Sequence, residues 1–284
     1  MVRATDVAVA AQLACLLEAS APKPGNVSPG RHFADARYED FLASAAAIGE
    51  PLAGAATRPL GATVRRAIDA TARWTRSNTN LGIVLLLAPL ARAALLSADL
   101  RRGLRDVLEA TTVDDARDVY AAIRHAGPGG LGHVESQDIA NEPDVTLRDA
   151  MRLAADRDGI AREYTTAFEV TFGTGAPSLE QGRRDGLSWD EAVVETFLTL
   201  LAAAPDTHVA RRAGPAVALE VTRRARTTLA AGGVRSVSGQ HAIDELDLWL
   251  RDSRHTTNPG TTADLTAAAI FVVLLRGGWR LGPA

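Results

Sequence analysis

The lysine at position 23 is the first residue of this chain whose type and setting suggest chemistry. Lys23 is the only lysine in a sequence whose Lys and Arg residues total 31. It stands between two prolines in Glu18-Ala-Ser-Ala-Pro-Lys-Pro-Gly25, and these prolines keep the backbone extended. An ammonium group is a compact charge that can contact a phosphate, whereas a guanidinium is a planar fork. We predict that Lys23 contacts a phosphate; its chance survival in an arginine-rich composition is the alternative.

The residues around Lys23 suggest a pocket for a triphosphate and Mg²⁺. A helix is expected to end near Glu18, whose carboxylate could bind the metal, and the loop then offers the Gly25 amide, Asn26 and Arg31. The order glycine-lysine-serine/threonine after a strand is missing, so this is not a Walker loop. Because a loop lysine is rarely part of a core, we expect Lys23→Ala to leave the fold intact.

A second polar segment precedes the most apolar stretch of the chain. Asn78, Thr79 and Asn80 come just before an expected helix over 81–96, with Gly82 in its first turn. Asn78 or Thr79, taken singly, is best explained as a helix cap. Two asparagines around a threonine exceed what one cap needs, and the free N–H groups of a helix start can bind an anion.

The third segment runs from Pro205 to Gly214 and contains Asp206, His208 and Arg211. Asp206 is expected to cap the following helix. Alternatively, an Asp, a His and an Arg on one turn could bind a metal-phosphate group.

The fourth segment is Thr257-Asn258-Pro259-Gly260-Thr-Thr-Ala-Asp264-Leu. Its Pro-Gly turn leads into an apolar helix expected over 262–275, with Asp264 in the first turn. The helix dipole favours an Asp there, and the alternative is a carboxylate directed into a central site.

The composition predicts an all-α fold with a single domain over residues 1–284. Aromatic residues make up only 5% and hydrophobic residues 46%, with long runs of Ala and Leu and no lasting period-two alternation. Ser188 and Glu191 have the spacing of a capping box. The expected helices are 7–19, 38–56, 62–76, 81–96, 101–110, 114–125, 147–157, 160–172, 188–203, 210–231, 239–254 and 262–275, with loops at 21–35, 127–145, 173–178, 232–239 and 255–261.

Several function classes are disfavoured. A net charge of −3 without a basic tract gives no footprint for nucleic acid. The longest apolar run, from Leu81 to Leu90, is too short to span a bilayer, and the N-terminus lacks the pattern of a signal peptide. Cys15, the single cysteine, cannot form an internal disulfide and is expected to be a buried packing residue. We therefore expect a soluble, cytoplasmic protein.

In their order along the chain, these four segments resemble the triphosphoribosyl-dephospho-CoA synthase family. Glu18 with the Pro-Lys-Pro-Gly segment matches the opening motif, and the Pro-Gly-x-x-Ala-Asp-Leu motif is matched by Pro259 to Leu265. The family's Asn-Thr-His-Lys-Gly element is matched only in part, because Asn80-Leu81 replaces His-Lys. The segment from Asp206 to Gly214 is similar to a further family element.

The resemblance implies a reaction and roles for the site residues. In the family, a ribose hydroxyl of 3'-dephospho-CoA attacks C1' of the ATP ribose with inversion, and adenine leaves. By this resemblance Lys23 and Arg31 would bind the triphosphate, and Mg²⁺ would lie between the phosphates and Asp206 or Glu18. Asp264 would activate the hydroxyl or stabilise the ribosyl cation. Ribose and base would be oriented by Asn78, Asn80 and Asn258.

Two other functions remain open at this point. The Asn80-Leu81 departure and the stretch over 127–142, which includes His133 and Glu135, would suit a phosphoribosyl transfer to another acceptor, as in tetrahydromethanopterin-type cofactor biosynthesis. A loop of this kind is usually solvated, and its one His and three carboxylates only weakly indicate a metal. The missing His-Lys pair would also suit a non-catalytic, nucleotide-binding helical protein. Pairing of apolar helices could produce a homodimer.

Overall fold

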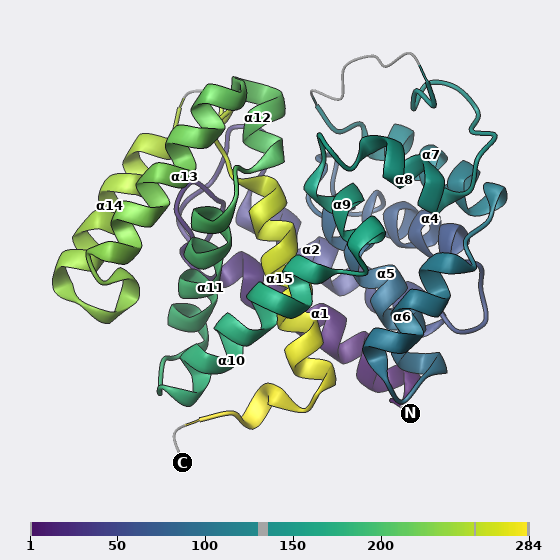
Figure 1. The fold of residues 1–284 in the computed structure, drawn as a ribbon, viewed down its shortest axis with the longest axis horizontal. Helices are drawn as coiled ribbons and strands as arrows, with labels where there is room; N and C mark the ends of the chain where they lie inside the picture. The colour runs from purple at the N-terminus through teal and green to yellow at the C-terminus, as the bar shows by residue number, and fades with distance from the viewer. Residues whose placement is uncertain (1, 130–135, 253, 283–284) are drawn as a thin grey trace. The chain divides into compact units, whose positions relative to one another are not determined.

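The computed structural model describes residues 2–129, 136–252 and 254–282, and these residues form helices and loops only (Figure 1). Within these ranges there is no β-strand; Ser28 and Arg31 form an isolated antiparallel bridge. The predicted all-α class is therefore confirmed. The chain divides into two compact units, residues 1–15 with 39–168 and residues 16–38 with 169–284. The expectation of a single domain stays a prediction.

The first unit is built around one apolar helix. It contains the first part of α1 (Ala4–Ser20) and most of α2 (Tyr38–Ala47). The helices that follow are α3 (Gly49–Ala53), α4 (Leu60–Thr71), α5 (Leu81–Leu96), α6 (Leu100–Glu109), α7 (Val113–Ala126), α8 (Leu147–Ala154) and α9 (Gly159–Thr166). Residues 83–91 of α5 are all buried, and α5 packs against α4, α6 and α9. Since an apolar surface all round a helix has to be covered, the polar-faced helices enclose α5.

The helix α5 contains a proline at a buried position, which normally breaks a helix. Pro89 has no N–H to donate to the carbonyl of Leu85, one turn earlier. The hydroxyl of the fully buried Tyr164, on α9, donates a hydrogen bond of 2.7 Å to that carbonyl. The helix therefore continues through Pro89 without leaving a buried acceptor unsatisfied.

The second unit also has an apolar helix at its centre. It contains the end of α1, the loop after it, and α10 (Ala176–Arg184), α11 (Trp189–Ala203), α12 (Thr207–Ala213), α13 (Pro215–Ala230), α14 (Val237–Leu250) and α15 (Gly260–Leu275). A π-helical turn, Thr171–Gly175, precedes α10, and short 3₁₀ turns lie at Gly233–Arg235 and Gly278–Arg280. Residues 266–273 of α15 are buried, and this helix packs against α10, α11 and α12.

Most predicted helices exist, but several boundaries were wrong. The expected helix over 210–231 is two helices, because Gly214 has φ +97° and Pro215 begins the next helix. The helix expected over 38–56 is interrupted near Ile48. The loop expected at 173–178 is helical, and α15 begins at Gly260 rather than at 262.

Other expectations are confirmed. The Ser188 hydroxyl accepts a hydrogen bond from the Glu191 amide, and the Glu191 carboxylate accepts one from the Ser188 amide, which completes the capping box at the start of α11. Cys15 is buried.

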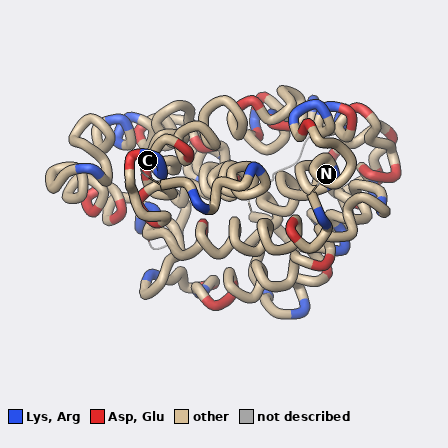
Figure 2. The backbone as a smooth tube through the Cα atoms, turned by 90° about the horizontal axis from the view of Figure 1, so that it is seen from below, with Lys and Arg blue, Asp and Glu red and all other residues tan. Residues whose placement is uncertain are grey.

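Acidic and basic residues alternate along the outer helices and loops in the view of Figure 2, with no long run of one sign. No single helix in the described ranges is long and apolar enough to cross a membrane, although the bent pair of α5 and α6 passes by length and composition.

Candidate functional site

Lys23 lies inside the second unit and is fully buried. Its Nζ pairs with Glu18 Oε1 at 3.0 Å and donates to the carbonyl oxygens of Glu18 and Ala21, the latter at 3.3 Å. Three acceptors thus satisfy the three N–H donors of the ammonium. The premise that a loop lysine lies outside the core was therefore wrong for Lys23.

The position of Lys23 has a local cause. The last turn of α1 contains no basic residue. Orphan carbonyls at the end of a helix carry partial negative charge and need donors. Lys23 folds back onto this end and donates to the carbonyls of Glu18 and Ala21. The single lysine therefore connects the Pro-Lys-Pro-Gly loop to the end of α1.

Gly25 follows Lys23 in a conformation that only glycine adopts easily. Its φ is +73°, and a Cβ there would lie 2.8 Å from Leu250 Cβ and 3.2 Å from Pro259 Cδ. The loop thus lies directly against the end of α14 and the Pro-Gly turn before α15. The sequence analysis predicted functional residues in segments 22–25 and 258–260, and these two segments lie in contact within the second unit.

Asp247 holds this loop from α14, and sequence reasoning missed it. Its Oδ1 accepts a hydrogen bond of 2.8 Å from the Gly25 amide, and its Oδ2 accepts one of 2.8 Å from Arg251 Nε. Arg31 Nη1 lies 3.3 Å from the same Oδ2. Arg251 Nη2 donates to the Asn26 carbonyl at 2.8 Å. An Asp and an Arg four positions apart resemble an ordinary surface pair of a helix, which is why the pattern gave no signal.

Asn26 contributes in two ways to the conformation of the loop. Its side-chain Nδ2 donates to the Pro24 carbonyl at 3.1 Å, and its own carbonyl accepts from Arg251. The side chain is buried. Asn26 therefore maintains the turn in this structure.

Asp206 joins the starts of two helices. Its Oδ1 accepts from the Val209 amide at 3.0 Å, which makes it the N-cap of α12. Its Oδ2 accepts from the amide and the hydroxyl of Thr262, both at 2.7 Å. The expected cap is confirmed, and the carboxylate in addition fixes the first turn of α15.

His208 lies against the same turn. Its Nδ1 is 3.0 Å from the Asn258 carbonyl, and because a carbonyl only accepts, Nδ1 carries the proton. Burial lowers the pKa of His208, and although Asp206 acts in the opposite direction, the result stays below the usual value. A Cβ on Gly260 would lie 2.7 Å from His208 Nδ1, so only glycine leaves room for the imidazole.

Asn258 presents a polar atom without an internal partner. Its Oδ1 is buried and accepts no hydrogen bond from the described part of the protein, whereas its backbone carbonyl is engaged by His208. A buried, unsatisfied oxygen is costly and often marks a place where a ligand or water binds.

Asp264 and Arg211 complete the predicted set in this unit. Asp264 is half-buried, and because α15 begins at Gly260 it lies in the second turn of the helix rather than the first. The helix dipole therefore does not explain the aspartate at position 264, since the dipole favours acidic residues only in the first turn. Arg211 is half-buried in the last turn of α12.

The remaining predicted residues belong to the first unit. Asn78 is exposed, and its Oδ1 accepts from the Leu81 amide at 3.1 Å, as a cap does. Thr79 and Asn80 are buried; Thr79 bonds to the Ser44 hydroxyl, and Asn80 Nδ2 donates to Thr71 Oγ1 at 3.0 Å. Gly82 is half-buried in the first turn of α5. Thr79 and Asn80 thus contribute to the internal packing of this unit.

Magnesium has no ready-made carboxylate site in the described part of this chain. No three His, Cys, Asp or Glu side chains converge within the described ranges. His133 and Glu135 lie outside those ranges. The Glu18 carboxylate faces the Lys23 ammonium, which would repel a cation. Asp206 already accepts three hydrogen bonds, so it offers at most a remaining lone pair. Mg²⁺ bound to ATP relies mainly on phosphate oxygens and water.

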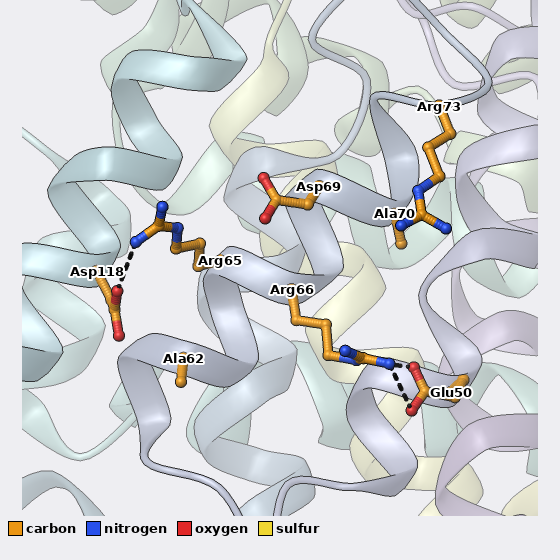
Figure 3. A pocket seen from close by; sticks show the side chains of 8 residues that line it. All are labelled: Glu50, Ala62, Arg65, Arg66, Asp69, Ala70, Arg73 and Asp118. Atoms are coloured by element: carbon orange, nitrogen blue, oxygen red, sulfur yellow. Dashed lines mark hydrogen bonds and ion pairs between the residues drawn. The ribbon is translucent and has the colours of Figure 1, made fainter.

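The first unit also contains a surface groove of about 300 Å³ along α4, shown in Figure 3. Arg65 pairs with Asp118 at 3.1 Å, and Arg66 with Glu50 at 3.0 Å. Arg73 and Asp69 line the same groove. Because three arginines and three carboxylates line the groove, its charges balance, and none of its residues was predicted to do chemistry.

Comparison with known proteins agrees with the motifs in the second unit. The family model for ATP:dephospho-CoA triphosphoribosyl transferase matches residues 4–282. The chain belongs to this family. The resemblance predicted from the sequence is thereby confirmed.

Individual relatives agree with the family match. A Pseudomonas putida protein described as a probable 2-(5''-triphosphoribosyl)-3'-dephosphocoenzyme-A synthase is 35% identical over 135 residues, 48% of each chain. A protein of Pseudomonas fluorescens with the same description is 28% identical over 201 residues, 71% of this chain and 62% of its own length. The chain thus matches about half to three fifths of the length of these two curated relatives.

A solved structure extends the similarity to the fold. A candidate triphosphoribosyl-dephospho-CoA synthase from Archaeoglobus fulgidus has a TM-score of 0.65 and 30% identity, covering 84% of this chain and 98% of that one. Both the helical architecture and the family assignment are thus supported by a three-dimensional relative.

Proposed function

We propose that the protein transfers a triphosphoribosyl group from ATP to a ribose hydroxyl of 3'-dephospho-CoA and releases adenine. The match of residues 4–282 to the transferase family carries this proposal. The arrangement of the second unit supports it, because the Pro-Lys-Pro-Gly loop lies against the turn that precedes α15. A homodimer, cytoplasmic location and use of ATP as its Mg²⁺ complex remain predictions.

The reaction exchanges one bond at C1' of the ATP ribose. The acceptor hydroxyl oxygen bonds to C1', the bond from C1' to the adenine nitrogen breaks, and the triphosphate stays on the transferred sugar. The hydroxyl loses a proton and the departing adenine gains one, so the protein needs a proton acceptor near the attacking oxygen and a donor near the leaving base. Positive charge that develops on the sugar is stabilised by a nearby carboxylate.

We assign the polar groups of the turn before α15 to the sugar and the acceptor. Asn258 Oδ1, which lacks a partner among the described residues, would accept a hydrogen bond from a ribose hydroxyl. The Nδ1–H of His208 is held by the Asn258 carbonyl, so a neutral imidazole leaves Nε2 as an acceptor. Asp264, half-buried in α15, would stabilise the ribosyl cation or activate the hydroxyl.

Lys23 acts indirectly, unlike the residues assigned to the sugar and the acceptor. Its three donors are engaged by Glu18 and Ala21, so a direct contact with a phosphate would require the buried ion pair to open. We propose that Lys23 acts on the triphosphate through the loop that it fixes. Arg31, which is half-exposed and pairs with Asp247, makes the contact.

The two alternatives that the sequence left open are not favoured by the family match. The departure at Asn80-Leu81 has a structural account: both side chains are buried, and Asn80 bonds to Thr71. The replacement of His-Lys therefore serves internal packing of the first unit.

Mass spectrometry of the purified protein with ATP, Mg²⁺ and 3'-dephospho-CoA tests the proposal. We expect free adenine together with an acceptor heavier by one triphosphoribosyl group, and neither without the acceptor. If ATP binds but no free adenine is released, the result would contradict the transfer and support a binding role. A phosphoribosyl diphosphate donor in the same assay distinguishes the other transferase.

A further inference from the structure

Two arginines of the second unit share one buried carboxylate. Asp247 Oδ2 accepts from Arg251 Nε at 2.8 Å, and Arg31 Nη1 lies 3.3 Å from the same oxygen. The Asp247 side chain is 8% exposed, whereas those of Arg31 and Arg251 are 40% and 21% exposed. The carboxylate is thus covered while part of each arginine side chain reaches the surface.

The charges of this group do not cancel. Two guanidiniums face one carboxylate, which leaves a net charge of about +1. Lys23 and Glu18 neutralise each other. The Asp252 carboxylate keeps its negative charge, but within the described ranges it bonds to Thr256 and Thr257 and to neither arginine. The excess positive charge therefore belongs to the two arginines.

Both arginines keep donors that the described residues do not use. A guanidinium has five N–H donors. Within the described ranges, the Arg31 side chain pairs only with Asp247, and Arg251 uses Nε for Asp247 and Nη2 for the Asn26 carbonyl. The N–H groups on Nη1 of Arg251 and on Nη2 and Nε of Arg31 are left for a ligand. Paired planar forks of this kind suit the oxygens of phosphate groups.

Asp247 and Arg251 are also bonded to the Pro-Lys-Pro-Gly loop. Asp247 Oδ1 accepts from the Gly25 amide at 2.8 Å, and Arg251 holds the Asn26 carbonyl. Side chains held by several bonds lose little freedom when a ligand binds, which strengthens binding.

We propose that Arg31 and Arg251, oriented by Asp247, form a subsite for the polyphosphate chain of the donor. Arg251 makes direct contact with phosphate oxygens, and Asp247 is a positioning residue that acts through the two arginines. The inference rests on the proposed function, because the donor's triphosphate is the anion that this subsite takes.

Inorganic tripolyphosphate is the probe, because it has the charge of the donor without its sugar or base. Affinity is measured by isothermal titration calorimetry for the full-length protein and for Arg31→Ala, Arg251→Ala and Asp247→Asn. Arg254→Ala and Asp244→Asn are the matched controls, since both side chains are exposed on the same unit. Circular dichroism melting of every variant records the effect on the fold separately.

We expect Arg31→Ala and Arg251→Ala each to weaken tripolyphosphate binding about tenfold or more, as loss of a charge-assisted hydrogen bond does. Both controls should bind like the unchanged protein. Asp247→Asn alone should weaken binding by a similar factor. In the Arg31→Ala background, Asp247→Asn should weaken binding by a smaller factor, because part of the effect of Asp247 passes through Arg31.

Unchanged affinity in Arg31→Ala and Arg251→Ala, with only a lower melting temperature, would overturn the subsite and leave a purely structural pair. Absence of tripolyphosphate binding by the unchanged protein would overturn it as well. If the arginine-dependent binding is found but no adenine forms with 3'-dephospho-CoA, the subsite stands and the proposed transfer fails.

Discussion

Tyr164 and Leu85 are connected by a hydrogen bond that replaces the one Pro89 cannot make. The Tyr164 hydroxyl lies 2.7 Å from the Leu85 carbonyl oxygen, and burial raises the pKa of this tyrosine, so it stays a donor. A helix with a proline at its centre is thus kept intact by a residue from another helix of the same unit.

Tyr164→Phe should therefore destabilise the protein by about 1–3 kcal/mol, since it leaves a buried carbonyl without a donor. Urea unfolding measures this change. In a Pro89→Ala background the same substitution should cost less, because the introduced alanine supplies the N–H for the Leu85 carbonyl. Equal costs in the two backgrounds would show that the tyrosine does not compensate for the proline.

Lys23→Ala should reduce stability by about 3–5 kcal/mol, because it leaves the Glu18 carboxylate buried without its partner. Thermal and urea unfolding are the measurements, with Arg73→Ala as an exposed control. The double variant Glu18→Gln/Lys23→Met should be more stable than Lys23→Ala alone. A Lys23→Ala protein as stable as the control would contradict the buried ion pair.

Gly25→Ala and Gly30→Ala separate two effects of a glycine. Both residues have positive φ, +73° and +75°, but a Cβ at Gly30 meets nothing within 4 Å. Gly30→Ala should cost about 1 kcal/mol from the backbone alone. Gly25→Ala should cost about 1–3 kcal/mol more, because its Cβ would clash with Leu250. Melting temperatures that fall equally would argue against the close packing of the loop on α14.

Asp252 should make the free energy of unfolding depend on pH in the acidic range. Burial raises the pKa of this carboxyl, but hydrogen bonds from Thr256, Thr257 and the Arg254 amide outweigh burial and lower it to about 2 from 3.8. Its contribution is complete above pH 3.8 and is lost as the pH falls towards 2. After allowance for screening by solvent, we expect about 1 kcal/mol.

Urea unfolding of Asp252→Asn at several pH values measures this contribution. The variant should be less stable than the unchanged protein at pH 6, and the difference should shrink as the pH approaches 2. Asp244→Asn, on an exposed part of α14, serves as the control. If the difference in unfolding free energy between the two proteins does not change with pH, the charge of Asp252 does not cause it.

Local sequence signals predicted much of the fold. The run of apolar residues over 81–96 gave α5 with its observed bounds, and Ser188 with Glu191 located the start of α11. Helices depend on neighbouring residues, so such signals suffice for them. The division at Gly214-Pro215 was also readable, since a glycine followed by proline ends one helix and begins another.

The site was only partly predictable, because burial and pairing depend on residues far apart in the chain. The Pro-Lys-Pro-Gly and Pro-Gly-x-x-Ala-Asp-Leu segments indicated two loops, which the second unit brings into contact. Nothing local to Lys23 indicates that it is enclosed, and nothing local to Asp247 indicates that its carboxylate reaches Gly25. The second of these facts follows from how α14 packs against the loop.

The bonds of Asp206 to two backbone amides have a consequence for the opening motions of the second unit. One carboxylate binds the Val209 amide in α12 and the Thr262 amide in α15. The start of α12 and the start of α15 share this acceptor, and each helps to hold the carboxylate in place. When the carboxylate is released, both helix starts lose a hydrogen bond together. In hydrogen–deuterium exchange, these two amides should therefore lose protection in a single shared event, and Asp206→Asn should speed both together.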